Sequence, residues 1–249
     1  MNPLWGVTLI GLAAGCIGTG LGGLIVAIFR MPKSRTLSFV LGFSGGIMLA
    51  VVFQDLIPES LNYGTQENLL FGFLLGCALL FILDRFLPHA HVTTIGSSKK
   101  NQRFVRTSIL IGIGIALHNF PEGLAIGAGY SASESLGISL AIVLAFHDMP
   151  EGMAMAGPMQ AARLGLVKIV WYCALSGVPT GLGALIGSYL GSISGVFLSI
   201  ALGFAAGAML YLVFDELLPI AYELDSGYSA TFGSVFGVVA GMMFLHLLA

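Results

Sequence analysis

Thr19-Gly-Leu-Gly-Gly-Leu-Ile25 recurs as Thr180-Gly-Leu-Gly-Ala-Leu-Ile186, 161 residues further along the chain. The same offset relates Phe43-Ser-Gly-Gly-Ile-Met-Leu49 to Phe204-Ala-Ala-Gly-Ala-Met-Leu210. It also relates later positions, which are Val52-Phe53 and Val213-Phe214, Pro58 and Pro219, and Phe71-Gly72 and Phe232-Gly233. An offset kept without gaps over three apolar segments indicates a duplicated three-helix unit, because shared apolar composition alone would not preserve the register.

The composition is that of a membrane protein. Hydrophobic residues make up 57% of the 249 positions, charged residues only 9%, and the mean hydropathy is +0.95. Soluble domains carry about 25% charged residues. The formal net charge of −2 argues against nucleic acid as a partner. The single domain, 1–249, is therefore expected to be an all-α transmembrane bundle in contact with lipid.

Eight apolar segments are long enough to cross a bilayer, which needs about 20 residues in a helix. They are 4–29, 36–58, 67–87, 108–130, 135–160, 164–190, 194–221 and 229–248. The duplicated units are then spans 1–3 and 6–8, and they flank a central pair, spans 4 and 5, in a 3+2+3 arrangement. The 35 glycines fit close helix packing in lipid.

Basic residues predict the orientation. All ten Lys and Arg residues lie in or beside the loops after spans 1, 3 and 5, which share one side of the bundle. The positive-inside rule makes that side cytoplasmic, together with the long loop 88–107, and places both termini outside the cytoplasm. Spans 1 and 6 then run in opposite directions, so the repeats are inverted, as is typical of secondary transporters.

Spans 4 and 5 carry a second repeat, His118-Asn-Phe-Pro-Glu-Gly123 and His147-Asp-Met-Pro-Glu-Gly152. In each motif His and Glu stand four residues apart and share one helix face, with Asn119 or Asp148 alongside the Glu. Two antiparallel helices can thus direct two imidazoles and two carboxylates at one another. Ionisable groups are costly in the middle of a membrane span and usually functional there.

These groups suit a divalent metal ion. Imidazole and carboxylate are ligands for first-row metals, and one dication would balance the charges of Glu122 and Glu151. Binding should also release protons held by the ligands. Pro121 and Pro150 free a backbone carbonyl in each span and are expected to kink it. The alternative is that His–Glu hydrogen bonds only join the helices.

At these motifs the sequence resembles the ZIP (Zrt- and Irt-like protein) family of metal transporters, most closely its bacterial zinc-uptake and GufA-like members. The resemblance covers nearly the whole chain. It implies a binuclear site, with one position formed by His118, Glu122, His147 and Glu151, possibly joined by Met48. The adjacent position would use Asn119, Glu122, Asp148 and Glu151, and both Glu residues would bridge.

The resemblance also implies a transported ion, Zn²⁺ first, with Fe²⁺, Mn²⁺ and Cd²⁺ as further candidates, and no organic cofactor. It implies transport toward the cytoplasm by alternating access, in which spans 1, 4, 5 and 6 move against the rest, and a homodimer in the cell membrane. One departure concerns span 6, where Ser176-Gly-Val-Pro-Thr-Gly181 lacks the carboxylate of many relatives. Thr180 stands in its place and leaves the second metal position open to question.

Other polar residues lie near the span ends. Asp84, Asp215 and Glu216 are expected near the inner ends of spans 3 and 7, where an exit route could receive the ion with His89 and His91. Asp55 and Glu59, near the outer end of span 2, could attract cations at an entrance. All of these residues could instead be interfacial.

Two other functional classes compete with transport. An intramembrane metalloenzyme could use a His/Glu cluster to activate water, and a metal-sensing or structural membrane protein could hold the ion without moving it. No HExxH pattern occurs in the sequence. The doubled, symmetric motif favours a path open to both sides over a catalytic pocket, so a transporter that is not an enzyme is predicted.

Overall fold

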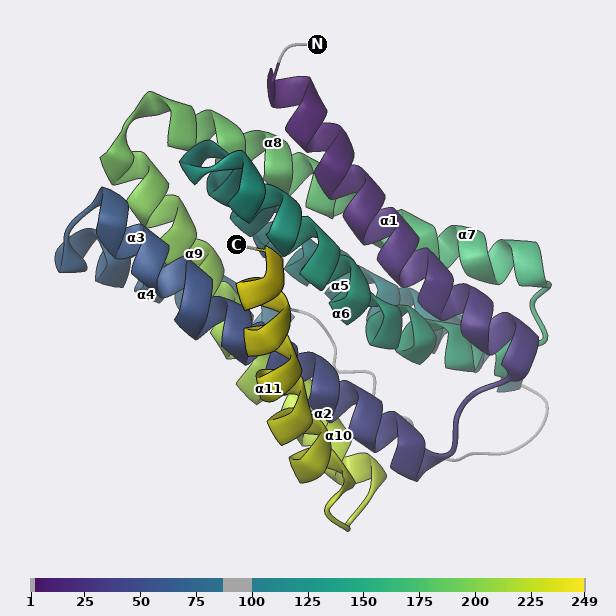
Figure 1. The fold of residues 1–249 in the computed structure, drawn as a ribbon. Coiled ribbons are helices and arrows are strands. Elements are labelled where there is room, and N and C mark those ends of the chain that lie inside the picture. Colours follow the sequence, from purple (N-terminus) through teal and green to yellow (C-terminus); the bar gives the residue numbers. More distant parts are fainter. Residues whose placement is uncertain (1–2, 87–99, 249) are drawn as a thin grey trace.

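The computed structural model describes residues 3–86 and 100–248, and all regular secondary structure within them is helical (Figure 1). The first half comprises α1 (Pro3–Phe29), α2 (Ser34–Ala50), the π-helical turn η1 (Val51–Leu56), α3 (Ile57–Tyr63), α4 (Gln66–Phe86) and α5 (Lys100–Ala132). The second half comprises α6 (Glu134–Ala161), α7 (Leu166–Ser176), α8 (Val178–Ile193), α9 (Gly195–Leu212), the π-helical turn η2 (Val213–Leu217), α10 (Leu218–Leu224) and α11 (Ser229–Leu248).

Within the described residues, seven helical segments are long and apolar enough to cross a membrane. They are Leu4–Phe29, Ser34–Tyr63, Gln66–Leu83, Glu134–Ala161, Leu166–Ile193, Gly195–Leu224 and Ser229–Leu247. These correspond to seven of the eight predicted spans. The remaining prediction, 108–130, lies inside α5, a helix that is not among the seven. The chain is therefore an all-α, multi-pass membrane protein.

One predicted boundary differs from the structure. The loop predicted at 88–107 ends earlier, because α5 already begins at Lys100, while 87–99 lie outside the described residues. Lys, Gln and Arg between positions 100 and 106 favour helix almost as well as Leu does. The helix therefore continues beyond the apolar segment from which its end was predicted.

The shorter connections end helices by local means. Arg30 and Arg163 adopt positive φ angles of 69° and 60°, which reverse the chain after α1 and α6. Ser133 caps the N-terminus of α6 by accepting a hydrogen bond from the Leu136 N–H. The bundle therefore turns at the sites where the sequence places breaks in hydropathy.

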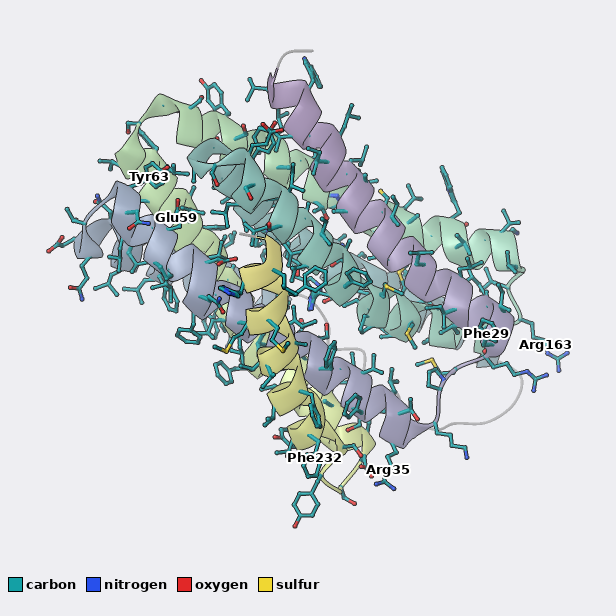
Figure 2. The ribbon with its side chains drawn as sticks, viewed as in Figure 1. Phe29, Arg35, Glu59, Tyr63, Arg163 and Phe232 are labelled. Atoms are coloured by element: carbon teal, nitrogen blue, oxygen red, sulfur yellow. The ribbon has the colours of Figure 1, made fainter. Side chains whose placement is uncertain are left out.

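The central helices α5 and α6 lie between two groups of helices (Figure 1). On one side α1 and the α7–α8 pair run antiparallel, and on the other side are α2 to α4 and α9 to α11. Contacts join α1 with α6, α8 with α5, α2 with α11, and α4 with α9. Exposed apolar side chains cover the outside of the bundle, as expected for a surface facing lipid (Figure 2).

Glycines in both central motifs bring the helices into close contact. Gly123 on α5 lies against the backbone of Thr180 on α8, and Gly152 on α6 lies against the backbone of Thr19 on α1. A Cβ atom at either glycine would collide with the neighbouring carbonyl group. These contacts hold the two motifs at the centre of the bundle. The two glycines are 29 residues apart and the two threonines are 161 residues apart, so the two contacts correspond in the repeats.

Two buried hydrogen bonds also occur at corresponding positions of the duplicated units. Ser38 on α2 donates to the Ala221 carbonyl oxygen at 2.7 Å, and Ser60 on α3 donates to the Ser199 carbonyl oxygen at 2.8 Å. Positions 38 and 199, and positions 60 and 221, differ by the offset of 161. The turns η1 and η2 also occupy corresponding stretches, each followed by Pro58 or Pro219. The duplicated sequence thus folds into duplicated local structure.

Candidate metal centre

Helices α5 and α6 bring the two central motifs face to face inside the bundle. His118, Asn119 and Glu122 lie on α5, and His147, Asp148 and Glu151 lie on α6. All six residues are buried, and none is more than 4% exposed. Burial of several ionisable groups at one place needs a compensating partner, because each unpaired charge is costly away from water.

Glu151 joins the two histidines. Its Oε2 lies 2.6 Å from the Nε2 of His118 across the helix pair, and its Oε1 lies 3.1 Å from the Nε2 of His147 on the same helix. The Oε1 of Glu122 lies 3.2 Å from the same His147 nitrogen. The two imidazoles and two carboxylates that the sequence pairs therefore converge at one place.

Two overlapping ligand groups can be drawn from this cluster. One consists of His118, Glu122 and Glu151, and the other of Glu122, His147 and Asp148. In each group, one potential ligand atom per residue lies within 4.8 Å of the others. Glu122 belongs to both groups, so its carboxylate is placed to interact with either of two neighbouring positions.

Several buried polar atoms of the described residues lack a hydrogen-bond partner. These are both oxygens of Asp148, both oxygens of Glu122, of which Oε1 has only the 3.2 Å contact with His147, the Nδ1 of His118, the Oδ1 of Asn119 and the Oγ1 of Thr180. Buried polar groups are normally satisfied, and a concentration of exceptions calls for an explanation. The available donors are two imidazoles and three carboxylates. They suit a transition-metal ion, which the partnerless oxygens could bind as ligands.

Ser44 on α2 orients His147, a contact that the sequence predictions missed. Its Oγ lies 2.5 Å from the His147 Nδ1 and also donates to the His147 carbonyl oxygen at 3.1 Å. When the hydroxyl donates to the carbonyl, Nδ1–H can donate to Ser44, and this contact turns Nε2 toward the two carboxylates, where it could bind a metal ion. The sequence offered one hint of this contact: Ser44 is polar, whereas the residue at the corresponding position of the repeat, Ala205, is apolar.

Asn119 bonds a backbone carbonyl of α7 that lies one helical turn before Thr180. The Asn119 Nδ2 donates to the Ser176 carbonyl oxygen at 2.9 Å. Ser176 is four residues before Thr180, and its carbonyl is the one that a threonine hydroxyl often bonds in a helix. In the other unit Thr19 does donate to the Gly15 carbonyl oxygen, at 2.8 Å. The Ser176 carbonyl oxygen therefore accepts from Asn119 and not from the Thr180 hydroxyl.

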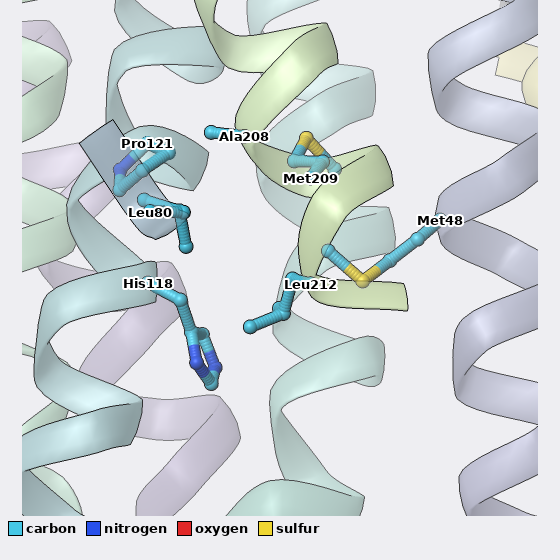
Figure 3. Close-up of a pocket in the computed structure, with 7 residues that line it drawn as sticks. All are labelled: Met48, Leu80, His118, Pro121, Ala208, Met209 and Leu212. Carbon is cyan, nitrogen blue, oxygen red and sulfur yellow. The ribbon is translucent and has the colours of Figure 1, made fainter. Parts of the chain in front are cut away.

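Met48 on α2 is fully buried and lines a small pocket together with His118 (Figure 3). The structure therefore places Met48 beside the cluster.

The remaining candidates lie outside the two buried groups found among the described residues. Asp55 and Glu59 are half-buried, and the Asn62 Nδ2 donates to Glu59 at 2.9 Å. On η2, Asp215 is exposed and Glu216 half-buried. Asp84 lies in α4, His89 and His91 lie outside the described residues, and Figure 2 shows Glu59 far from Arg35 and Arg163.

The fold and the buried ligand cluster are those of a polytopic metal-handling membrane protein, and comparison with known proteins identifies the family. The family described as ZIP zinc transporter matches residues 4–107 and 91–249. The chain belongs to this family, and it is a membrane transporter rather than an enzyme.

Individual relatives agree with this assignment. The zinc transporter ZupT of Salmonella newport is 38% identical over 248 residues, which cover 97% of this chain and 93% of the relative. The zinc transporter ZupT of Salmonella agona matches equally well. The zinc transporter ZupT of Escherichia fergusonii is 38% identical over 237 residues, 92% of each chain. The family resemblance predicted from the two motifs is confirmed.

Proposed function

We propose that the protein carries Zn²⁺ across the membrane toward the cytoplasm through the cluster between α5 and α6. The observation that supports this most directly is the pair of buried ligand groups that share Glu122. Membership of the ZIP zinc transporter family and the zinc transporters among its relatives support zinc as the ion. Fe²⁺, Mn²⁺ and Cd²⁺ remain additional candidate substrates, because His and carboxylate ligands accept several of these ions.

The first metal position would use His118, Glu122, His147 and Glu151, with Met48 beside it. The second would use Asn119, Asp148 and the two glutamates, with Glu122 and Glu151 as bridges. Three buried carboxylates carry a formal charge of −3 when ionised, so one or two dications bring the cluster close to neutrality. Thr180 offers a neutral hydroxyl near the second position, where it would be a weaker ligand than a carboxylate.

The alternative that His–Glu hydrogen bonds only join the helices accounts for part of the cluster. It explains the contacts of Glu151 with His118 and His147. It does not explain why the Oε2 of Glu122 and both carboxylate oxygens of Asp148 are buried without hydrogen-bond partners among the described residues. A metal ion accounts for both sets of atoms, and this difference favours a metal site over hydrogen bonds that only join the helices.

The architecture supports alternating access. We assign α1–α4 and α7–α11 as inverted repeats around α5 and α6, in a 3+2+3 arrangement. The repeated hydrogen bonds of Ser38 and Ser60, and the antiparallel course of α1 and α7–α8, support this assignment. Transport would occur as α1, α5, α6 and α7–α8 move against the other helices, in a homodimer whose termini face outward.

The proposed path extends from the cluster to both membrane surfaces. Asp55 and Glu59 would attract cations at the outer entrance, because acidic side chains at a mouth raise the local cation concentration. Asp84, Asp215, Glu216, His89 and His91 would form the cytoplasmic exit. Figure 2 supports separate ends, because Glu59 and the basic residues Arg35 and Arg163 lie at different edges of the bundle.

Zinc uptake into proteoliposomes tests the proposal. We expect saturable entry into vesicles containing the wild-type protein and entry at the level of empty vesicles for Glu122→Ala/Glu151→Ala. Glu134→Ala, which removes a carboxylate from the exposed first turn of α6, is the matched control and should retain uptake. The proposal is wrong if the double variant, reconstituted in equal amount, transports zinc at the wild-type rate.

A further inference from the structure

Tyr63 links two groups of helices at the end of the bundle that is predicted to face outward. It is the last residue of α3, and its hydroxyl donates a hydrogen bond to the Ala132 carbonyl oxygen at 3.0 Å. Figure 2 shows Tyr63 beside Glu59 at one edge of the bundle. Ala132 is the last residue of α5. The contact therefore joins the group that contains α2 to α4 and α9 to α11 to the group that contains α1 and α5 to α8.

The backbone around Tyr63 is fixed to α9, within its own group of helices. Ser60 donates to the Ser199 carbonyl oxygen at 2.8 Å. A Cβ atom at Gly64 would lie 2.5 Å from the Ser199 side chain, and one at Gly195 would lie 2.8 Å from the Tyr63 carbonyl oxygen, so α3 and α9 are in close contact here. The Tyr63 side chain therefore reaches across to α5 from a helix end that is anchored to α9.

The acceptor belongs to a helix end that needs a donor. The last four carbonyl groups of an α-helix have no partner within the helix, and Ala132 ends α5. The Tyr63 hydroxyl supplies the hydrogen bond from the other group of helices. Because the bond would break if the outer ends of α3 and α5 moved apart, it favours the arrangement in which these two ends are together.

The repeats show that the corresponding contact cannot form at the opposite end of the bundle. The offset of 161 relates Tyr63 to Leu224, the last residue of α10. The offset of 29 relates Ala132 to Ala161, the last residue of α6. Leu224 has no hydroxyl group, so it cannot donate a hydrogen bond to a carbonyl of α6. The hydrogen bond of Tyr63 therefore distinguishes the outer end from the inner end.

We propose that the hydrogen bond from Tyr63 to Ala132 is a latch that keeps the outer side of the transport path closed and so favours the state open to the cytoplasm. The inference deepens the proposed function and rests on its alternating access. One neutral hydrogen bond shifts such an equilibrium by about 2- to 10-fold. Tyr63 lies outside both buried ligand groups, so it is a positioning residue and not a metal ligand.

Loss of the latch should make zinc uptake from the outside more sensitive to low zinc concentrations. An ion that enters only the outward-open state has an apparent dissociation constant that falls as the population of that state rises. The zinc concentration for half-maximal uptake should therefore fall by up to the same factor, about 2- to 10-fold. A substitution that only weakens packing would not strengthen the apparent affinity, so this readout separates a latch from a purely structural contact.

The reactivity of a buried cysteine near the outer end tests the latch directly. Leu198 on α9 is buried, and a Cβ atom at Gly191 on α8 would lie 3.2 Å from it, so Leu198 lies where the two groups meet. We would introduce Leu198→Cys into a chain in which the three native free cysteines are replaced, by Cys16→Ala, Cys77→Ala and Cys173→Ala. Its rate of modification by a maleimide in detergent follows the open fraction even when that fraction is small.

We expect Tyr63→Phe to speed the modification of Leu198→Cys by about 2- to 10-fold. Tyr222→Phe is the matched control, because the Tyr222 hydroxyl lies 3.3 Å from the Thr231 hydroxyl and joins α10 to α11 within one group. It should leave the rate unchanged. Gln66→Cys, at an exposed position of α4, should react equally fast with and without Tyr63→Phe. Equal modification rates of Leu198→Cys with and without Tyr63→Phe would overturn the latch.

Zinc uptake from the medium into cells that express the protein gives a second test without a substitution in the core. Tyr63→Phe should lower the half-saturating zinc concentration, and Tyr222→Phe should not change it. An unchanged or higher value in Tyr63→Phe would contradict the latch even if the wild-type protein takes up zinc. A wild-type protein that takes up no zinc would contradict the proposed function instead, and the modification rates of Leu198→Cys would still decide whether Tyr63 holds the outer ends together.

Discussion

The units α1–α4 and α7–α11 place corresponding residues 161 positions apart, but their chemistry differs beside the central cluster. Ser44 of the first unit hydrogen-bonds His147, and the corresponding residue of the second unit is Ala205. Thr19 donates to its own helix, whereas Thr180 has no partner among the described residues. Similar backbones therefore present different polar groups to α5 and α6.

The difference extends to the two histidines. The Nδ1 of His147 is bonded to Ser44, while the Nδ1 of His118 lacks a hydrogen-bond partner in the described structure. A metal-binding histidine with a partner on its second nitrogen is oriented in advance and is a stronger base. The comparison teaches that duplication supplies the scaffold, and that a few substitutions give the two sides of the site separate properties.

The largest expected effect separates the two overlapping ligand groups. Glu122→Gln removes a negative charge from both groups, whereas Asp148→Asn alters only one. We expect Glu122→Gln to reduce zinc uptake to background and Asp148→Asn to retain part of it. Uptake rates in proteoliposomes containing equal amounts of each variant measure the difference. A greater loss in Asp148→Asn would show that Glu122 is not the shared ligand.

A smaller effect is expected at Ser44. Ser44→Ala leaves His147 Nδ1 without its partner, so zinc affinity should fall by about 10- to 100-fold. The loss should raise the zinc concentration needed for half-maximal uptake more than it lowers the maximal rate. Ser60→Ala, which removes another buried serine hydrogen bond, is the control and should not alter this concentration. Equal effects of the two alanine variants would indicate a general loss of packing.

Stability should distinguish Thr19 from Thr180 in the metal-free protein. Thr19→Val removes a buried hydrogen bond and should lower the free energy of unfolding by about 0.6–1 kcal/mol. Thr180→Val removes a hydroxyl that has no partner among the described residues, so it should leave stability unchanged or raise it. Denaturation of both variants in detergent measures the difference, and equal destabilisation would contradict the assigned asymmetry.

The smallest effect concerns the repeated contacts between the units. Ser38→Ala and Ser60→Ala each remove one serine-to-carbonyl hydrogen bond, and we expect each to cost about 0.6–1 kcal/mol. Ser60 also lies 3.0 Å from the Ser199 hydroxyl, so its variant should be at the upper end of this range. Denaturation of both variants in detergent tests whether the two serine hydrogen bonds contribute similar free energies of unfolding. A difference of several kcal/mol between the two variants would mean that the contacts are not equivalent.

Much of this organisation could be predicted from sequence. Apolar segment lengths identified the spans, and the His–Glu spacing placed His118, Glu122, His147 and Glu151 on facing helices. The start of α5 at Lys100 was missed because hydropathy marks a membrane boundary, not the end of a helix. Ser44 was missed because contacts between distant helices depend on helix rotation and crossing, which a single sequence does not specify.

Anomalous X-ray diffraction from crystals soaked in zinc, with data on both sides of the zinc absorption edge, tests the central claim most directly. The account predicts a zinc-specific peak between α5 and α6 within ligand distance, about 2.0–2.2 Å, of His and Glu side chains from both motifs. Peaks found only at the molecular surface, with the central cluster free of zinc at saturating concentration, would contradict the account.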